Sequence, residues 1–464
     1  MFYRKDYWKY LLILLLLSLP VFQYLGFHVI RIWDESRLAI NAYEMYHHGN
    51  YLIPTFDGAP DMWSTKPPLM IWLQVFSMKL FGINEISLRL PAALAAFFTC
   101  ITLLILSVKY LKNFWFGVFC ALALVTTAGF INNHTARTGD YDALLTLFLT
   151  LCCFSFFAFL QTLKTKYLYF FFLLFSLAFL TKSAAALIIL PGLFIYTVTQ
   201  KKLLFLLKNK HLYMGLLGFL TLGGGYFLLR EIYNPGYIEA AWKNDFGGRF
   251  LDSIEQHKQG FWFYITYKFN LWLMFIPFGI VTGLLNKDKR IKHLTLFSTI
   301  MAITFFLVIS FSKTKLSWYG MPLFPFIAIL AGTFIYFIFS LLKEKIKNYK
   351  HLKYNVIPYI FVFLVFIIPY IYIFNKTYKP KEKSDFYRTS YYLRDILNGK
   401  RQGDNFTVLY DGYCAHIMFY INLLNDKGKN ITLKTSKEVK AGENVLTFQD
   451  NMQENVKNYL FLLK

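Results

Sequence analysis

The sequence predicts a polytopic α-helical membrane protein that carries a small soluble α/β domain at its C-terminal end. Hydrophobic residues make up 56% of the 464 residues and charged residues 16%, whereas a soluble globular protein carries about 25% charged residues. The mean hydropathy is +0.41. Apolar runs of roughly 17–25 residues, the length that crosses a bilayer as a helix, recur along the chain and leave the charges between them.

About eleven such spans are expected from the length of a membrane helix. The first follows Arg4, Lys5 and Lys9 and has no small-x-small site after it, so we predict an anchor rather than a cleaved signal peptide. Near residues 167–200 the only break is Thr181-Lys182-Ser183, which makes the helix count there the least defined. The predicted spans are residues 10–30, 90–108, 115–131, 142–162, 167–181, 184–200, 212–230, 262–285, 293–312, 321–341 and 354–374.

The formal net charge is +23, an excess typical of nucleic-acid-binding proteins, but its placement indicates membrane topology instead. With the N-terminus in the cytoplasm, the cytoplasmic loops hold twenty basic residues against three acidic ones. The opposite loops hold the two signs in nearly equal number. Basic residues collect in the cytoplasmic loops of membrane proteins. We therefore expect a cytoplasmic N-terminus, a lipid bilayer around the chain and no nucleic-acid partner.

Residues 1–374 form the predicted transmembrane domain, and residues 375–464 form the soluble domain. An odd number of spans places the soluble domain on the side opposite to the N-terminus. Within it, N-F-T-V-L-Y and N-V-L-T-F are typical of strands, and helices are expected near 387–397 and 415–424. Four of the five cysteines lie in apolar runs, so neither a disulfide framework nor a cysteine metal site is expected.

The longest polar stretch, residues 31–89, is the predicted first loop outside the cytoplasm. Its start favours an amphipathic helix in the membrane interface, with Asp34 as the N-cap and Gly49 as the stop. Polar side chains recur there at helical spacing, at Asp34, Arg37, Asn41, Glu44 and His48.

Further loops on the same side carry acidic, basic and aromatic groups together. They contain N-N-H-T-A-R-T-G-D-Y-D at 132–142, W-K-N-D-F-G-G-R-F at 242–250 and S-K-T-K-L-S-W-Y-G-M-P at 312–322. The chemistry of the protein is therefore expected on this one face of the membrane.

Short motifs in these loops, taken in order over about residues 30–330, resemble one enzyme family. They are W-D-E-x-R, K-P-P-L before a Trp, G-x-N-E-x-x-x-R-L-P, R-T-x-x-x-D and K-x-x-W-Y-x-x-P-x-x-P. Together they resemble the GT-C glycosyltransferases, and within them the protein-mannosyltransferase-like branch that includes the bacterial lipid A aminoarabinose transferases. No single motif would suffice.

The resemblance implies transfer of one sugar from a polyprenyl-phosphate donor to an acceptor at the periplasmic face of the bacterial cytoplasmic membrane. It implies that Asp34 is the essential acid, that Glu35 and Arg37 belong to the same motif, and that Lys66 holds the donor phosphate. Thr65 stands where the aminoarabinose transferases carry a glutamate that contributes to a metal site. This difference argues against a divalent metal and against aminoarabinose as the sugar, and no cofactor is assigned.

The chemistry of such a transfer points to further residues. A departing phosphate needs cations, and an acceptor hydroxyl needs a base that contributes roughly 10²–10⁴-fold. Asp34 is the predicted base of a single inverting displacement, with Asp140 or Asp142 in support. The candidate phosphate-binding cations are Lys66, Arg37, Arg249, Lys313 and Lys315. The candidate acceptor or interface residues are Trp33, Arg137, His257, Trp318 and Tyr319.

Plainer interpretations exist for each of these residues. Asp34 could cap its helix, Lys66 could be an interfacial lysine, and one of Asp140 and Asp142 could cap a helix. His134 and His257 are more often structural than metal ligands. For the whole chain, the alternatives are a transporter or flippase for lipid-linked sugars and a non-catalytic glycan-assembly subunit. The sequence leaves open the sugar and the acceptor, which is lipid A, another glycolipid or a protein.

Overall fold

The computed structural model of the chain describes residues 7–132, 134–246, 259–266, 271–347, 356–378, 385–440, 442–448 and 460–461. Contacts within the chain define two units. The first consists of Met1–Tyr24, Met62–Met70 and Pro91–Lys379, and the second of Leu25–Asp61, Ile71–Leu90 and Pro380–Lys464. Most of the predicted first loop thus folds in the same unit as the C-terminal segment.

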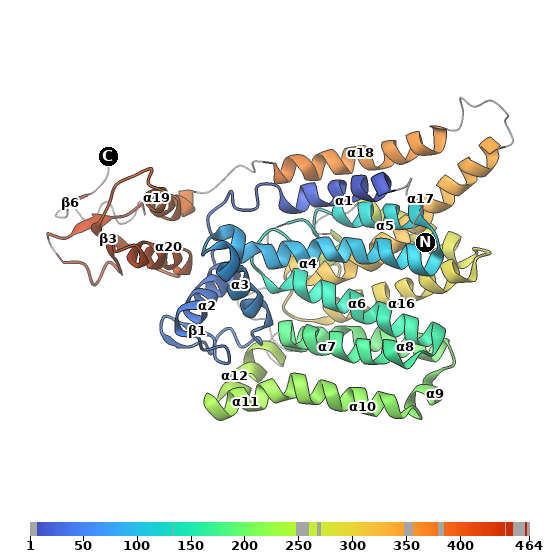
Figure 1. The fold of residues 1–464 in the computed structure, drawn as a ribbon, viewed down its shortest axis with the longest axis horizontal. Helices are drawn as coiled ribbons and strands as arrows, with labels where there is room; N and C mark the ends of the chain where they lie inside the picture. The colour runs from blue at the N-terminus through green and yellow to red at the C-terminus, as the bar shows by residue number, and fades with distance from the viewer. Residues whose placement is uncertain are drawn as a thin grey trace. The chain divides into compact units, whose positions relative to one another are not determined.

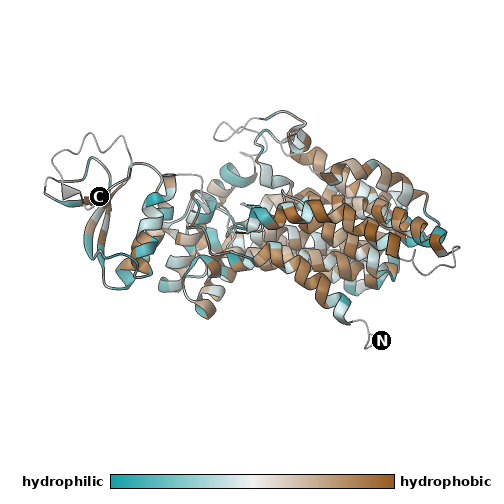
Figure 2. Cartoon of the chain, turned by 90° about the horizontal axis from the view of Figure 1, so that it is seen from above, coloured by the Kyte–Doolittle hydropathy of each residue, from teal (hydrophilic) through white to brown (hydrophobic). Residues whose placement is uncertain are grey.

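The first unit is a bundle of helices, several of which run side by side in Figure 1. Hydrophobic residues dominate these helices in Figure 2, as expected of helices that face lipid or one another. The longer helices are α1 (Tyr7–Phe22), α4 (Glu85–Leu106, which begins in the second unit), α5 (Phe114–Val125), α6 (Tyr141–Thr162), α7 (Thr165–Ala186), α8 (Leu190–Thr199), α10 (Lys210–Phe219), α11 (Gly225–Tyr233), α15 (Ile276–Leu284), α16 (Lys289–Phe311), α17 (Phe324–Lys347) and α18 (Ile357–Thr377).

Shorter helical turns connect these helices. Three of them are π-helical, namely η2 (Ser107–Leu111), η4 (Leu220–Gly224) and η5 (Trp242–Phe246). The remaining turns are η3 (Leu187–Ile189), α9 (Leu203–Leu207), α12 (Tyr237–Ala241), α14 (Phe263–Thr266), η7 (Leu271–Phe275) and η8 (Ser317–Leu323).

Seven helices of the described chain are long and apolar enough to cross a membrane, judged by length and composition. They are Glu85–Leu111, Tyr141–Thr162, Thr165–Thr199, Lys210–Tyr233, Lys289–Phe311, Ser317–Ile346 and Ile357–Thr377. Shorter apolar helices occupy Tyr7–Phe22, Leu69–Phe81, Phe114–Val125 and Leu271–Leu284. The fold is that of a multi-pass membrane protein.

The segment Thr165–Thr199 contains two crossings, because α7 is broken near its end. Lys182 and Ser183 have non-helical dihedral angles (φ −152°, ψ 53° and φ 13°, ψ −102°). Lys182 contacts Asp142 at the start of α6, and Tyr196 contacts Gln161 at the end of α6. The chain therefore returns along α6 after the break. With this pair counted separately, each of the eleven predicted spans has a counterpart in the described residues.

Close helix approaches organise the bundle around α17, which packs on α5, α15 and α16. A Cβ added to Gly332 would lie 2.5 Å from the Cys120 sulfur, and one added to Gly279 would lie 1.9 Å from the Leu330 carbonyl oxygen. Small residues allow such contacts between membrane helices, where van der Waals packing replaces the hydrophobic effect. Replacing either glycine by a larger residue would force α17 away from its neighbour.

The second unit joins the first loop to the C-terminal segment. The predicted amphipathic helix is α2 (Asp34–His48), and it ends at Gly49, whose φ of 70° is the left-handed conformation that glycine adopts readily. A two-residue hairpin, β1 (Thr55–Phe56) with β2 (Ala59–Pro60), and α3 (Leu69–Phe81), which begins in the first unit, follow. In this unit α2 packs against α20 (Ala415–Asp426).

A four-stranded parallel sheet forms the rest of the second unit, in the order β4-β3-β5-β6. The strands are β3 (Asn405–Leu409), β4 (Asn430–Lys434), β5 (Asn444–Leu446) and β6 (Leu460–Phe461), and the helices are η10 (Asp385–Tyr387), α19 (Arg388–Leu397) and α20. Leu409 of β3 and Val445 of β5 are buried together. The two predicted strands and the two predicted helices are confirmed, and β4 and β6 are additional.

His416 in α20 predicts that low pH destabilises the second unit. It is fully buried, its ring stacks on Phe386 at 5.2 Å, and both ring nitrogens lack a hydrogen-bond partner among the described residues. Burial lowers the pKa of His416 to about 4, whereas an unfolded chain has a histidine pKa of about 6.5. Between these values the unfolded state binds more protons, so stability falls as the pH falls from about 6.5 towards 4, by up to about 3 kcal/mol.

Hydrogen-exchange protection factors of the α20 amides in the purified full chain, compared at pH 7 and pH 4.5, measure this loss. The variant His416→Phe keeps an aromatic ring on Phe386 and removes the titrating group, so its protection should fall less on acidification. Equal losses in the two proteins would assign the acid sensitivity to other groups.

Candidate active site

The start of α2 presents Asp34, the predicted catalytic carboxylate. The expectation that Asp34 caps the helix is wrong, because the N-cap position is Trp33, with φ 72° and ψ −121°, and Asp34 is the first helical residue. A tryptophan at positive φ is strained, and such strain is concentrated at functional sites. Asp34 is exposed, and no hydrogen bond or ion pair of its carboxylate occurs among the residues described here.

The two neighbours of Asp34 in its motif are both bound to protein partners. Glu35 is 1% exposed and forms a bidentate ion pair with Arg89, at 2.6 and 3.0 Å. Arg89 also donates to the carbonyl oxygens of Leu25, His28 and Val29. The Glu35 carboxylate therefore joins α2 to the start of α4, and its geometry is that of a structural residue.

Arg37 is held in the same way by Asp61, which accepts from Nε at 2.8 Å and from Nη2 at 2.7 Å. Its guanidinium lies 4.3 Å from the centre of the Phe56 ring. Burial alone would lower the pKa of Arg37, but the hydrogen bonds and the charge of Asp61 raise it above its ordinary value. Arg37 is thus permanently charged, and Asp61 already occupies the bidentate face that would bind a phosphate.

Trp33 lies on an aromatic stack of the second unit. Its ring is 4.9 Å from that of Tyr413 with an interplanar angle of 9°, and Phe56 stacks on Tyr413 at 6.4 Å. Trp33 remains 58% exposed. This exposed ring beside Asp34 suits the predicted role of Trp33 in contacting an acceptor or the membrane interface.

In the first unit, the segment Met62–Met70 carries Lys66 in a mostly buried position. The Lys66 Nζ atom lies 3.8 Å from Asp245 Oδ1 and 5.5 Å from the centre of the Tyr141 ring, and the Lys66 side chain is 13% exposed. No hydrogen bond from Nζ occurs within the described chain. An ammonium group has three N–H donors, so the Lys66 ammonium has donors available for an anion.

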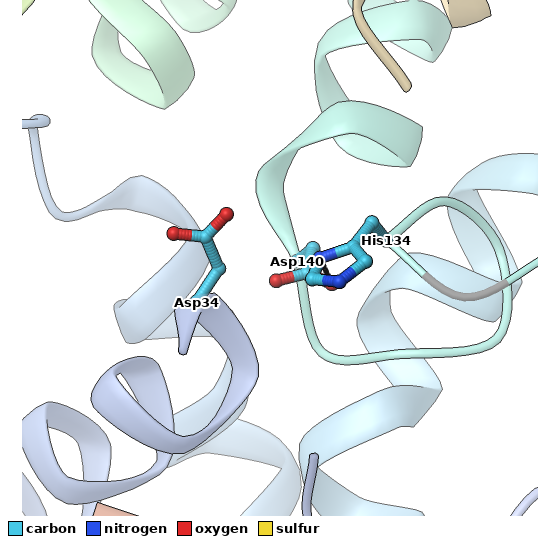
Figure 3. Close-up of side chains that lie close together, drawn as sticks. All are labelled: Asp34, His134 and Asp140. Carbon is cyan, nitrogen blue, oxygen red and sulfur yellow. Dashed lines mark ion pairs between the residues drawn. The ribbon is translucent and has the colours of Figure 1, made fainter. Parts of the chain in front are cut away.

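The loop before α6 brings His134 and Asp140 together (Figure 3). His134 Nδ1 lies 3.4 Å from Asp140 Oδ2, and the His134 ring stacks on Trp318 at 4.1 Å. Asp140 occupies the N-cap position of α6 without making a side-chain cap bond. Its Oδ2 accepts from the Thr138 hydroxyl, and its buried Oδ1 has no hydrogen-bond partner among the described residues. A buried, half-satisfied carboxylate is costly and points to function rather than to capping.

Asp142, two residues further on, forms a buried ion pair with Lys182 at 2.8 Å. The Lys182 Nζ atom also lies 4.8 Å from the centre of the ring of Tyr319, which is another predicted site residue. The sequence predicts Lys182 only as part of the break between two spans. A charge inside a long apolar run is itself a functional signal in a membrane protein and could have identified it.

The remaining predicted residues fall into three groups. Lys315 is buried, donates to the Ser312 carbonyl oxygen at 2.5 Å, and has its pKa lowered by burial, whereas Lys313 is exposed. Arg137 donates to the carbonyl oxygens of Val21 and Tyr24, which ties the loop before α6 to the end of α1. Arg249 and His257 lie outside the described residues.

An apolar cavity of about 220 Å³ lies in the first unit beside Trp318. Mostly hydrophobic side chains of α14, η7, α15, α16, η8 and α17 line it, and Asn132, Tyr264 and Ser317 add polar groups. The buried Tyr264 hydroxyl has no hydrogen-bond partner within the described chain. Such a cavity fits part of an amphiphile whose hydrocarbon is buried and whose polar group can meet that hydroxyl.

Comparison with known proteins identifies this architecture. Residues 65–223 match the family described as dolichyl-phosphate-mannose-protein mannosyltransferase. The chain aligns structurally with ArnT from Cupriavidus metallidurans bound to undecaprenyl phosphate, with a TM-score of 0.70, 17% identity, and coverage of 97% of this chain and 87% of that one. The chain has the GT-C fold. The archaeal oligosaccharyltransferase AglB from Archaeoglobus fulgidus shares it at a TM-score of 0.56 and 12% identity, with coverage of 90% and 64%.

Two sequence relatives match two thirds or more of this chain. An uncharacterized protein of Aquifex aeolicus is 28% identical over 346 residues, 73% of this chain and 66% of that protein. The undecaprenyl phosphate-alpha-4-amino-4-deoxy-L-arabinose arabinosyl transferase of Aeromonas salmonicida is 28% identical over 329 residues, 67% of this chain and 56% of the transferase. The chain thus spans less than two thirds of the length of these relatives. The resemblance to the GT-C glycosyltransferases read from the sequence motifs is confirmed.

Position 65 does not fit the metal that the aminoarabinose transferases imply. Thr65 is fully buried, and its hydroxyl donates to Asp245 Oδ2 at 2.6 Å, so it offers no carboxylate to a cation. His134 and Asp140 supply two possible ligand atoms in this unit, and such a pair alone does not identify a metal site.

Proposed function

We propose that this protein is a glycosyltransferase that moves one sugar from a polyprenyl-phosphate donor to a lipid A-type glycolipid or another acceptor of the bacterial envelope. The observation that carries this proposal is the Lys66 ammonium, which is mostly buried and has hydrogen-bond donors to spare for a phosphate. Likeness to ArnT bound to undecaprenyl phosphate and to arabinosyl transferases that act on undecaprenyl-linked sugars supports the same donor class.

The proposed reaction is a single inverting displacement. The acceptor hydroxyl oxygen forms a bond to the anomeric carbon while the bond from that carbon to the phosphate oxygen breaks. The hydroxyl proton passes to a carboxylate, and we assign that role to Asp34, which is exposed and has no partner among the described residues. Lys66 stabilises the negative charge that develops on the departing phosphate.

The apolar cavity beside Trp318 supports a lipid substrate. Its volume of about 220 Å³ holds only part of a long hydrocarbon chain, so the rest would remain in the bilayer. Ligand pockets combine such apolar walls with a few polar groups that fix orientation. Asn132, Ser317 and the Tyr264 hydroxyl supply those groups.

A transporter or flippase for lipid-linked sugars is the second candidate function. Transporters carry ionisable groups near the middle of the bilayer on interrupted helices, and α7 is interrupted at Lys182. However, Lys182 pairs with Asp142 in the first turn of α6, so this ion pair lies at a helix end. The interruption therefore reverses the chain and does not create a mid-span site.

Proteoliposomes loaded with a radiolabelled polyprenyl-phosphate sugar and a glycolipid acceptor separate the two functions. A transferase forms a new glycosidic bond, so the label appears on the acceptor. A flippase only moves the labelled donor between leaflets, and that outcome would overturn our proposal. Mass spectrometry of envelope glycolipids from a deletion strain then identifies the acceptor and the sugar.

The proposal also requires an orientation, which the loop charges predict. The basic residues concentrate in the predicted cytoplasmic loops, so the chain after Asn375 is expected outside the cytoplasm. A reporter that is active only outside the cytoplasm should therefore be active when it is fused after Asn375. Paired alkaline phosphatase and green fluorescent protein fusions at this residue measure it. Fluorescence without phosphatase activity would reverse the orientation and move the proposed reaction to the cytoplasmic face.

A further inference from the structure

Lys66 lies beside the carboxylate of Asp245, which has no role in the proposed sugar transfer. Asp245, in the π-helical turn η5, lies 3.8 Å from the Lys66 Nζ atom, and its side chain is 10% exposed. A cation that binds a phosphate gains nothing from a fixed negative neighbour, since that neighbour repels the ligand. The position of Asp245 therefore needs an explanation.

Several contacts fix Asp245 beside Lys66. The Thr65 hydroxyl donates to Asp245 Oδ2 at 2.6 Å, and the Tyr237 hydroxyl donates to the Thr65 carbonyl oxygen at 2.7 Å. Asn244 donates to the carbonyl oxygens of Met62 and Trp63, at 3.1 and 3.3 Å. Three of these hydrogen bonds come from the turn η5 and the fourth comes from α12, and the carboxylate cannot move away when a ligand arrives without breaking its bond to Thr65.

The charges of donor and product differ at this position. A sugar linked through a phosphodiester carries one negative charge, whereas the polyprenyl phosphate left after transfer is a monoester with a charge of about −1.5 to −2 at pH 7. A fixed carboxylate repels the second ligand more strongly than the first, and the effect is large where water is scarce.

We propose that Asp245 makes the Lys66 site select a phosphodiester over a phosphomonoester, so that the donor is bound and the product is released. This inference rests on the proposed function, because it takes Lys66 as the phosphate-binding lysine. Thr65 is the residue that holds Asp245 in place. Asp245 is a specificity-determining residue, and the catalytic roles stay with the groups that touch the reacting atoms.

A pair of lipids that differ only in charge tests the proposal without knowledge of the sugar. The probes are undecaprenyl phosphate and its methyl ester, a phosphodiester with one negative charge. Binding of each to the purified full chain in detergent gives two dissociation constants, and their ratio, monoester over diester, is the measured quantity. We expect this ratio to fall by about fivefold or more in Asp245→Asn, from the loss of one nearby charge.

Matched variants separate charge from structure. Asp245→Asn keeps an acceptor for the Thr65 hydroxyl, Asp245→Glu restores the charge, and Thr65→Val removes the hydrogen bond while the charge remains. The ratio should return towards the wild-type value in Asp245→Glu and change less in Thr65→Val than in Asp245→Asn. Glu239→Gln is the control on the same segment, since Glu239 pairs with Lys243 at 2.5 Å on the exposed surface; its ratio should equal that of wild type.

Two results would overturn the proposal in distinguishable ways. If Lys66→Ala weakens binding of both lipids but Asp245→Asn leaves the ratio unchanged, Asp245 is only a structural link and the proposed function stands. If wild type binds neither lipid, or Lys66→Ala binds both as wild type does, the phosphate site itself is wrong and the inference falls with it.

Discussion

Replacing Asp34 with asparagine is expected to lower sugar transfer by two or more orders of magnitude, the contribution typical of a catalytic base. Asparagine has nearly the same shape and cannot accept the proton of the acceptor hydroxyl. The helix should tolerate the change, because Asp34 is the first residue of α2 and not its N-cap. Loss of a carboxylate at this position costs only about 0.3–1 kcal/mol through the helix dipole.

Transfer of labelled sugar from polyprenyl phosphate in proteoliposomes measures this effect, with thermal stability followed in parallel. Glu35→Gln is the matched comparison on the adjacent residue. It leaves Arg89 buried without its counter-charge, at a cost of about 3–5 kcal/mol. We therefore expect the first variant to lose turnover and keep stability, and the second to lose stability. If Asp34→Asn retains more than about a third of wild-type turnover, the base must be sought at Asp140.

The membrane-spanning helices could be predicted because their signal is local. In lipid, a single apolar run can hydrogen-bond all of its backbone N–H and C=O groups only by forming a helix. The positions of the helices can therefore be predicted from the composition of each run. Even the break at Thr181-Lys182-Ser183 was visible as three polar residues between two apolar runs. The geometry of that break was not visible, because it depends on Asp142, which is 40 residues earlier in the chain.

Partners of charged side chains could not be predicted for the same reason. Asp34, Glu35 and Arg37 are equivalent as a sequence motif, yet Glu35 is bound to Arg89 and Arg37 to Asp61, which lie 54 and 24 residues away. Those two ion pairs leave Asp34 as the member of the motif whose carboxylate is open to a substrate. Sequence spacing gives the candidates, and only tertiary contacts distinguish a structural charge from an available one.

Short strands and caps were the other features that local pattern could not give. β4 (Asn430–Lys434) reads N-I-T-L-K, an alternation confined to five residues, and its parallel pairing with β3 from Asn405 to Leu409 is a tertiary contact. Trp33 takes the N-cap position at a positive φ although Asp34 is the better cap by propensity. At Trp33 tertiary structure overrides the local preference, and it does so beside the predicted catalytic residue.

Replacing Lys66 with alanine is expected to weaken donor binding by about ten- to a hundredfold, which corresponds to about 1.5–3 kcal/mol for a charge-assisted hydrogen bond. The Lys66 side chain is 13% exposed, so the lost interaction is poorly replaced by water. The variant should also leave Asp245 without its cation, which adds repulsion between that carboxylate and the phosphate. Titration of the purified chain with the methyl ester of undecaprenyl phosphate, a phosphodiester like the donor, measures the change.

Lys79→Ala is the control that separates a specific phosphate site from nonspecific attraction to an anionic lipid. Lys79 lies in α3, in the same polar stretch of the sequence, but it is exposed and donates to the Tyr51 hydroxyl at 2.7 Å. Lys79 has the features of an ordinary interfacial lysine, whose apolar stem lies along the protein and whose charge is hydrated. If nonspecific attraction between a basic surface and an anionic lipid governed binding, the two variants would lose affinity equally. A loss confined to Lys66→Ala requires a phosphate held at one position, which a glycosyl donor needs for its anomeric carbon to meet the acceptor.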